Sequence, residues 1–137
     1  DFQKEKKFDL TACRNIYEGE IREYALKQLF DASKIKYEYQ VKKEKKFEEG
    51  FELVAVSDFL FPDYILECKS PREFSGIKEY HKPQLECQYR LFGKPVYVVY
   101  VKSHMENQIF RYNPNDKFWE MILEKVGEFY KNLIHQC

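Results

Sequence analysis

Three side chains with the chemistry of phosphate and metal sites lie within one twelve-residue stretch: Asp58, Glu67 and Lys69. The residues around them are mostly β-branched, aliphatic or aromatic, which is typical of strands that pack into a core. Charges in such strands cost free energy unless they pair with each other or bind a metal. A hard divalent cation such as Mg²⁺ binds one or two carboxylates and keeps waters that a phosphate can replace. The stretch therefore indicates metal chemistry at a phosphate, with a structural Asp58–Lys69 ion pair as the simpler alternative.

The pair Pro62-Asp63 separates two apolar runs and predicts how the strands meet. Proline favours the second position of a β-turn, so we expect Phe61–Tyr64 to be the turn of an antiparallel hairpin. In that register Asp58 lies directly opposite Glu67, with Cβ atoms about 5 Å apart. Lys69 follows Glu67 by two residues and therefore points to the same face of the strand.

Asp58 followed by Glu67-Cys68-Lys69 resembles the motif of the PD-(D/E)xK nuclease superfamily. The resemblance implies that Asp58, Glu67 and the backbone carbonyl of Cys68 hold Mg²⁺ or Mn²⁺. It also implies that Lys69 positions or activates the attacking water. On this basis we expect Asp58, Glu67 and Lys69 to be the catalytic residues.

One departure from the motif decides which aspartate is assigned to the metal. Ser57, not proline, precedes Asp58, whereas a literal Pro-Asp pair occurs at Asp63. Asp63, however, is four residues from Glu67 on one strand, roughly 13 Å away, which is too far to share an ion. We therefore assign Asp58 to the metal and Asp63 to the turn.

A helix is expected before the hairpin, from about Asn15 to Ser33, with Asn15 as its N-cap. An apolar stripe at helical spacing supports it, formed by Tyr17, Ile21, Ala25, Leu29 and Ala32. By resemblance, a glutamate of this helix completes the metal site. Glu20 lies at the edge of the stripe, whereas Glu23 matches the Gly-to-Glu spacing of archaeal Holliday junction resolvases and lies nearer Leu26 and Phe30. Both glutamates stay candidates.

The segment Ser70–Pro83 reads as a loop that leaves the candidate site. It carries basic residues that a substrate phosphate could approach, namely Arg72, Lys78, His81 and Lys82. A short helix over Gln84–Phe92 follows. Gln84 resembles the glutamine of a helix in the nuclease domains of bacterial recombination helicase-nucleases, although the tyrosine follows at five residues instead of four. We count Gln84 as a further candidate site residue.

The remaining elements are four expected strands and a final helix. They are a half-exposed strand from Ile35 to Val41 that runs on to Phe47, a strand over Phe51–Phe61, a central strand over Pro95–Val101, a short strand over Ile109–Tyr112 and a helix over Phe118–Ile134. The central strand is expected to be buried on both faces and parallel to the Glu67 strand, and the last helix to cover the sheet. The order α-β-β-β-α-β-(β)-α predicts an α/β fold, a mixed β-sheet flanked by helices, as expected of a restriction-endonuclease-like core.

Composition limits the class of partner. At 137 residues the chain is expected to be one nuclease-like domain, with residues 1–12 flexible. Lys+Arg and Asp+Glu each number 23, so the net charge is zero, whereas nucleic-acid binders are more often basic. The basic residues are partly segregated. Those expected to contact nucleic acid are Lys42, Lys43, Lys45, Lys46, Arg72 and Lys78.

Cysteine usage and hydropathy bear on compartment and cofactor. The cysteines stand at positions 13, 68, 87 and 137, and none forms a CxxC pair, which argues against zinc and iron–sulfur sites. Free thiols predict a reducing, intracellular location, in the cytoplasm of a cell or of a host. No apolar run is long enough to span a membrane.

These features predict a Mg²⁺-dependent nuclease that hydrolyses phosphodiester bonds of DNA, by endo- or exonucleolytic attack. A homodimer is compatible with this prediction, because cutting both strands of a duplex requires two sites. Two alternatives belong to other classes: a catalytically idle DNA-binding relative, and a protein-interaction domain.

Overall fold

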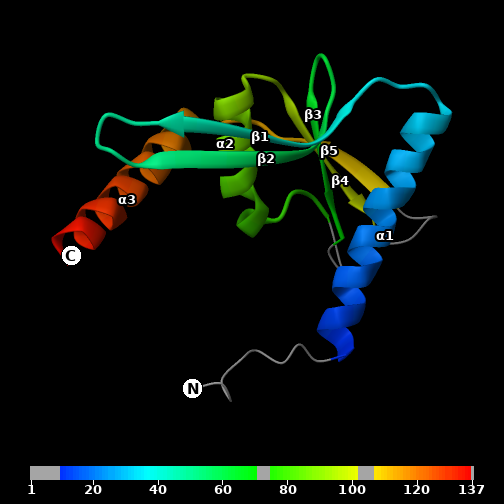
Figure 1. The fold of residues 1–137 in the computed structure, drawn as a ribbon, viewed down its shortest axis with the longest axis horizontal. Coiled ribbons are helices and arrows are strands. Elements are labelled where there is room, and N and C mark those ends of the chain that lie inside the picture. The colour runs from blue at the N-terminus through cyan, green and yellow to red at the C-terminus, as the bar shows by residue number, and fades with distance from the viewer. Residues whose placement is uncertain (1–9, 71–74, 102–106, 137) are drawn as a thin grey trace.

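The computed structural model describes residues 10–70, 75–101 and 107–136, with side chains from residue 20 onward (Figure 1). The elements are α1 (Leu10–Ala32), β1 (Glu38–Lys46), β2 (Glu52–Leu60), β3 (Ile65–Lys69), a 3-10 turn η2 (Glu79–His81), α2 (Lys82–Phe92), β4 (Val96–Val101), β5 (Asn107–Arg111) and α3 (Asp116–His135). This order confirms the predicted α/β class, including the optional extra strand. None of the helices in the described ranges is long and apolar enough to cross a membrane.

The sheet is open and mixed, with its strands in the order β1-β2-β3-β4-β5. β3 and β4 are parallel, as predicted, and the chain returns between them through α2. The other neighbouring strands are antiparallel. β3 therefore has an antiparallel neighbour on one side and a parallel neighbour on the other.

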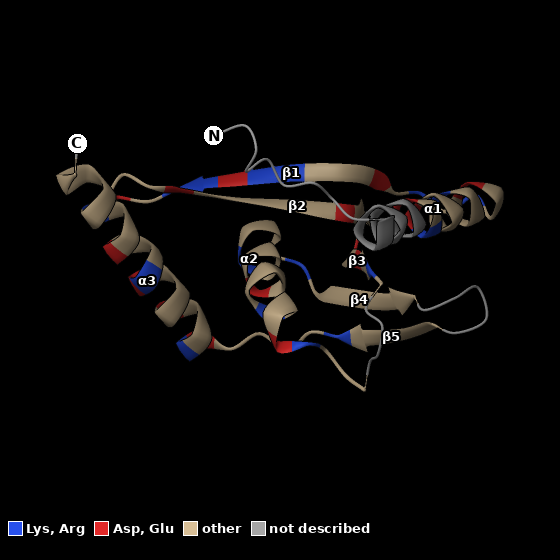
Figure 2. Ribbon diagram, turned by 90° about the horizontal axis from the view of Figure 1, so that it is seen from below, with Lys and Arg blue, Asp and Glu red and all other residues tan. Residues whose placement is uncertain are grey.

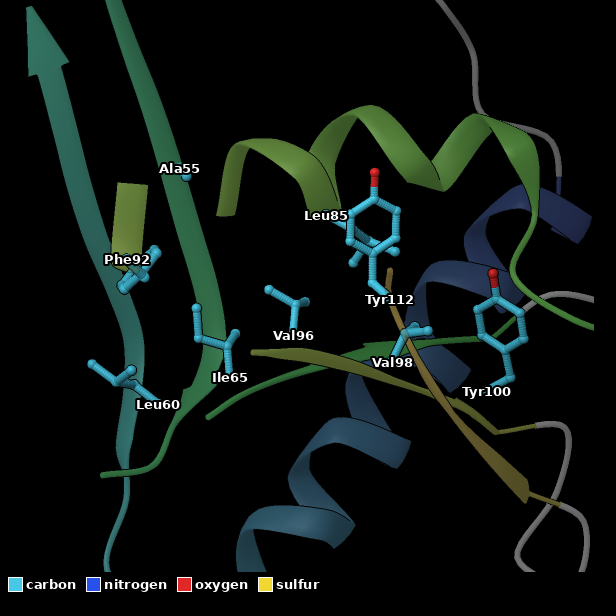
Figure 3. Close-up of a cluster of buried hydrophobic side chains, with 9 residues drawn as sticks. All are labelled: Ala55, Leu60, Ile65, Leu85, Phe92, Val96, Val98, Tyr100 and Tyr112. Atoms are coloured by element: carbon cyan, nitrogen blue, oxygen red, sulfur yellow. The ribbon is translucent and has the colours of Figure 1, made fainter. Parts of the chain in front are cut away.

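Each face of the sheet packs against one helix. The cluster on the α2 side consists of Ala55, Leu60, Ile65, Leu85, Phe92, Val96, Val98, Tyr100 and Tyr112 (Figure 3). The cluster on the α1 side consists of Phe59, Phe61, Leu66, Val99 and Val101, packed against Leu26 and Phe30 of α1. β4 contributes alternate residues to the two clusters, which confirms that this strand is buried on both faces.

The β2–β3 hairpin has the predicted register. The Phe61 N–H donates to the Tyr64 carbonyl across the Pro-Asp turn, at 2.9 Å. Phe59 pairs with Leu66, and Leu60 pairs with Ile65. The next position along the hairpin brings Asp58 opposite Glu67.

Several elements begin at residues other than those predicted. α1 begins at Leu10, so Asn15 lies inside the helix and is not its N-cap. Residues 10–12 of the predicted flexible segment form the first residues of α1, and the rest of that N-terminal segment lies outside the described residues. β1 begins at Glu38, three residues later than expected. α2 begins at Lys82, directly after η2, where the sequence predicted a loop.

The packed face of α1 is not the predicted stripe. Ile21 and Leu29 are 47% and 58% exposed, whereas Leu26 and Phe30 are half-buried against the sheet. The Phe30 ring meets the ring of Phe59 edge-on at 5.2 Å, and that of Phe61 at 5.3 Å. Because the sheet surface here is aromatic, contact with Phe30 sets the rotation of the helix and outweighs the more regular aliphatic stripe.

α3 does not cover the sheet, contrary to the expectation for Phe118–Ile134. It lies at the end of the molecule opposite to α1, beside the β1–β2 turn (Figure 1, Figure 2). Its Tyr130 ring contacts Phe51 at 6.1 Å, its Trp119 ring contacts Phe47 at 6.5 Å, and none of its residues is buried. An amphipathic pattern indicates that a helix has a partner surface but does not say which one.

A buried carboxylate joins α2 to the start of α3. Glu86 is fully buried and accepts hydrogen bonds from Arg90 Nε at 2.7 Å, Tyr112 Oη at 2.6 Å and the Asn115 N–H at 2.9 Å. Arg90 also bonds Asp116 at 2.7 Å. Because several donors satisfy its buried carboxylate, Glu86 has a structural role.

Replacing Leu85 by alanine is expected to lower the free energy of unfolding by about 2–5 kcal/mol, because this fully buried side chain would leave a cavity beneath α2. The matched control is Leu29→Ala on α1, where the side chain is 58% exposed and the change should stay within about 0.5 kcal/mol. Urea denaturation followed by circular dichroism measures both. Equal losses in the two variants would contradict the assignment of the core to the α2 side.

Candidate active site

Where β2 and β3 separate, hydrogen bonds between main chain and side chains replace the backbone ladder. Among the described residues, the ladder between these strands ends at the Phe59–Leu66 pair. Beyond it, the Asp58 N–H donates to Glu67 Oε1 at 3.0 Å, and the Cys68 N–H donates to Asp58 Oδ2 at 2.9 Å. Each carboxylate is therefore held by the main chain of the opposite strand. The structure brings the two predicted metal ligands together at this gap.

Glu67 is only 1% exposed and is surrounded by donors. Gln88 Nε2 donates to its Oε1 at 2.7 Å, Gln84 Nε2 donates to its Oε2 at 3.2 Å, and Lys69 Nζ lies 3.8 Å from Oε2. Burial, followed by the charge of Asp58, raises the pKa of Glu67 to about 8, although the Asp58 N–H, the charge of Lys69 and the Gln88 amide oppose the shift. The carboxyl is poised to lose its proton near neutral pH.

Gln88 contacts the site directly but was not among the predicted site residues. It is fully buried, and its Nε2 also donates to the Val56 carbonyl at 2.8 Å, which ties α2 to β2. The signal available in the sequence was spacing: Gln88 follows Gln84 by four residues, so both project from one face of a helix. The five-residue spacing between Gln84 and Tyr89 does not point to Gln88.

Of the two candidate glutamates on α1, Glu23 is the one that contacts residues beside Asp58. Glu23 Oε1 accepts hydrogen bonds from Tyr39 Oη at 2.5 Å and Gln40 Nε2 at 2.8 Å. Gln40 Nε2 also lies 3.2 Å from Asp58 Oδ1, which links the helix to the metal-ligand candidate. Glu20 is exposed and, in the described part of the chain, makes no contact with this cluster. The choice follows from the rotation of α1, because its packed face lies nearer Glu23.

A basic group flanks Lys69 on the other side of the site. Tyr100, the partner of Lys69 in the parallel ladder, accepts the Lys78 N–H at 2.8 Å, and its hydroxyl lies 2.7 Å from His81 Nδ1. Burial, then the charges of Lys69 and Lys78, lower the pKa of His81. Lys78 and His81 therefore lie close to the candidate site. Arg72 lies outside the described residues.

The lysines of β1 do not form one patch. Lys43 extends toward α2, with its Nζ 5.9 Å from the Phe92 ring, whereas Lys42 pairs with Glu44 at 2.9 Å. Successive strand residues point to opposite faces, so the four predicted lysines divide into two pairs. Figure 2 shows acidic and basic residues side by side on this strand.

The oxygen atoms at the gap suit a hard cation. Asp58 and Glu67 supply carboxylates, and the Cys68 N–H points toward Asp58. Because the N–H and carbonyl of one strand residue point to the same side, the Cys68 carbonyl is expected to face Asp58 as well. Magnesium and manganese take such ligands and complete their shell with water. Across the described residues, no three of His, Cys, Asp and Glu gather in a metal-ligating group, so any ion here would rely on carbonyl and water oxygens as well.

The thiols do not compete for such an ion. Burial, then the charge of Asp58, raises the pKa of the Cys68 thiol to about 12, so it stays protonated. Cys68 and Cys87 are free cysteines, as predicted, whereas the side chains of the cysteines at positions 13 and 137 lie outside the described residues.

No family model and no curated protein matches the chain. Solved structures match its fold. An alkaline exonuclease from Laribacter hongkongensis (LHK-Exo) aligns over 98% of this chain and 74% of its own, with a TM-score of 0.69 and 15% identity. The protein SSO0001 aligns over 82% of this chain with a TM-score of 0.66 and 18% identity, and the chain spans 58% of its length. At these identities the likeness concerns the fold.

The raised pKa of Glu67 makes stability depend on pH in the metal-free protein. The folded chain keeps a proton that the unfolded chain releases, so the free energy of unfolding should fall as pH rises from about 4.5 to about 8. Glu67→Gln, which mimics the protonated form, should lack this fall and should be more stable than the wild type at pH 8. Glu128→Gln, on the exposed surface of α3, is the control. Parallel curves for wild type and Glu67→Gln would contradict the burial of a titrating carboxyl.

Proposed function

We propose that the chain is a nuclease domain that uses Mg²⁺ or Mn²⁺ to hydrolyse phosphodiester bonds of DNA. The observation that carries the proposal is the convergence of the Asp58 and Glu67 carboxylates at one gap in the sheet, beside Lys69 and the backbone of Cys68. The resemblance to the PD-(D/E)xK motif and the likeness in fold to an alkaline exonuclease support it.

Asp58, Glu67 and the Cys68 carbonyl would hold the cation. When bound, it would polarise a phosphate and lower the pKa of a water. Two adjacent carboxylates, one of them buried, destabilise each other's charged forms, and a divalent cation removes that cost. Because a protonated carboxyl is a poor ligand, cation binding should strengthen as pH rises toward 8.

The surrounding side chains have distinct roles in this proposal. Lys69 is partly exposed at the mouth of the site, where its ammonium can orient the attacking water or stabilise charge on the phosphate. Gln84 and Gln88 fix the direction of the Glu67 carboxylate. Lys78 and His81 lie where the next phosphate of the substrate would approach.

The fold likeness also bears on the mode of cleavage. LHK-Exo is an alkaline exonuclease. By analogy we propose that this chain digests DNA from ends and does not cut circular DNA internally. A rise in activity toward alkaline pH would agree with the raised pKa of Glu67.

A protein-interaction domain is the second candidate, and one observation favours it. An apolar groove of about 980 Å³ runs between α1 and strands β3, β4 and β5. Exposed side chains along it include Ile21, Leu29, Tyr64 and Ile109. The groove does not account for the paired carboxylates of Asp58 and Glu67, which are not among its lining residues, so failure to bind a divalent cation is the result that would favour this candidate.

The central test compares two aspartates that differ only in position. Asp58→Asn keeps the shape of the side chain but removes the ligand charge, so Mg²⁺-dependent cleavage should fall by orders of magnitude. Asp63→Asn should stay near wild type, because asparagine also favours turns and Asp63 is exposed. The assay incubates the protein with linear, circular and branched DNA, and with RNA, with and without Mg²⁺. Undiminished cleavage by Asp58→Asn, or loss of cleavage in Asp63→Asn alone, would contradict the proposal.

A further inference from the structure

Gln40 has an unusual backbone conformation for the middle of a strand. Its φ is +54°, in the left-handed region that side-chain-bearing residues rarely adopt. Lys34 shares this property, with φ +57°, but lies just after α1, where helices commonly end in that way. Throughout the described β1–β2 hairpin, residues on both sides of Gln40 pair in register, whereas Gln40 and Asp58 do not pair. Such outliers often mark functional sites.

The left-handed residue turns β1 over. Tyr39 reaches Glu23 on the α1 side of the sheet, whereas Val41 packs into the cluster on the α2 side. Residues two apart in a regular strand point to the same face, so the alternation shifts by one position at Gln40. β1 therefore contacts α1 through Tyr39 and contributes Val41 to the cluster on the α2 side.

The partner strand changes face at the same level. On β2, Phe59 packs on the α1 side and Ala55 packs on the α2 side, although both positions are odd-numbered. Asp58 lies within this change of face, opposite Gln40. The two side chains therefore meet at the point where the sheet reverses its alternation.

The Gln40 amide joins two carboxylates. Its Nε2 lies 2.8 Å from Glu23 Oε1 and 3.2 Å from Asp58 Oδ1, which uses both hydrogens of the amide. Asp58 Oδ2 already accepts the Cys68 N–H, so both oxygens of Asp58 are fixed. Without this donor, the carboxylates of Glu23 and Asp58 would have no shared partner between them in the described structure.

We propose that Gln40 is a positioning residue that orients Asp58 for a divalent cation and couples Glu23 of α1 to the site. The inference rests on the proposed function, because it assigns Gln40 a role around the cation held by Asp58 and Glu67. Partners of this kind, hydrogen-bonded to ligands, typically change metal affinity by about 10- to 100-fold when mutated. In the left-handed conformation of Gln40, its amide reaches both carboxylates.

Gln40→Gly provides the most direct variant. Glycine adopts the left-handed conformation without strain, so the fold should be kept while the amide is lost. Gln40→Asn is the second variant, because asparagine also tolerates this conformation but is one methylene too short to reach both carboxylates. Lys34→Gly is the matched control, since it relaxes the other left-handed residue away from the site. Melting temperature and circular dichroism establish that each variant folds.

The readout is Mn²⁺ affinity, measured by titration calorimetry and by the paramagnetic resonance signal of free Mn²⁺, without DNA. Gln40→Gly and Gln40→Asn should bind at least about tenfold more weakly than wild type, and Lys34→Gly should bind equally well. Wild-type affinity in both Gln40 variants, while Glu67→Gln abolishes binding, would overturn this inference and leave the proposed function standing. Absence of Mn²⁺ binding in the wild type would overturn both.

Discussion

The candidate site depends on an exchange of hydrogen bonds between two strands. Where β2 and β3 part, the Asp58 N–H donates to the Glu67 carboxylate and the Cys68 N–H donates to the Asp58 carboxylate. An antiparallel pair would ordinarily bond main chain to main chain at this point. The side chains satisfy both N–H groups instead, which opens the sheet and holds the two acids side by side.

The rest of the fold stabilises the two carboxylates, although burying Glu67 beside Asp58 is energetically unfavourable. Glu67 is buried beside another acid, and both its burial and the charge of Asp58 raise its pKa. α2, anchored in the core by Leu85 and Phe92, brings Gln84 and Gln88 onto the carboxylate. β1 contributes in a different way, through a left-handed residue that reverses the alternation of the strand. The two glutamines of α2 stabilise the Glu67 carboxylate without a cation, and Gln40 of β1 does the same for Asp58. The remaining oxygen lone pairs of both carboxylates can still bind a cation.

The hairpin could be predicted from the sequence because its determinants are local. Pro62-Asp63 fixes the turn, the turn fixes the register, and the register places Asp58 opposite Glu67. The central strand could also be predicted, since a short continuous apolar run is typical of a strand that is buried on both faces. The hairpin alone brings the candidate ligands Asp58 and Glu67 together.

The predictions for α1 and α3 were wrong because the packed face of one helix and the position of the other depend on contacts between segments far apart in the sequence. The rotation of α1 is set by contact of Phe30 with an aromatic sheet surface, and that rotation brings Glu23 within reach of Gln40. The position of α3 depends on the contact of its Tyr130 with Phe51 at the β1–β2 turn. No glycine or turn signal accompanies Gln40, so its conformation could not be predicted from local propensity.

A crystal of the protein soaked in Mn²⁺, with anomalous diffraction recorded near the manganese edge, tests the central claim most directly. One strong anomalous peak is expected between the carboxylates of Asp58 and Glu67, within bonding distance of the Cys68 carbonyl. A peak at Asp63, or no peak at the gap between β2 and β3 in a protein that binds Mn²⁺ in solution, would contradict it.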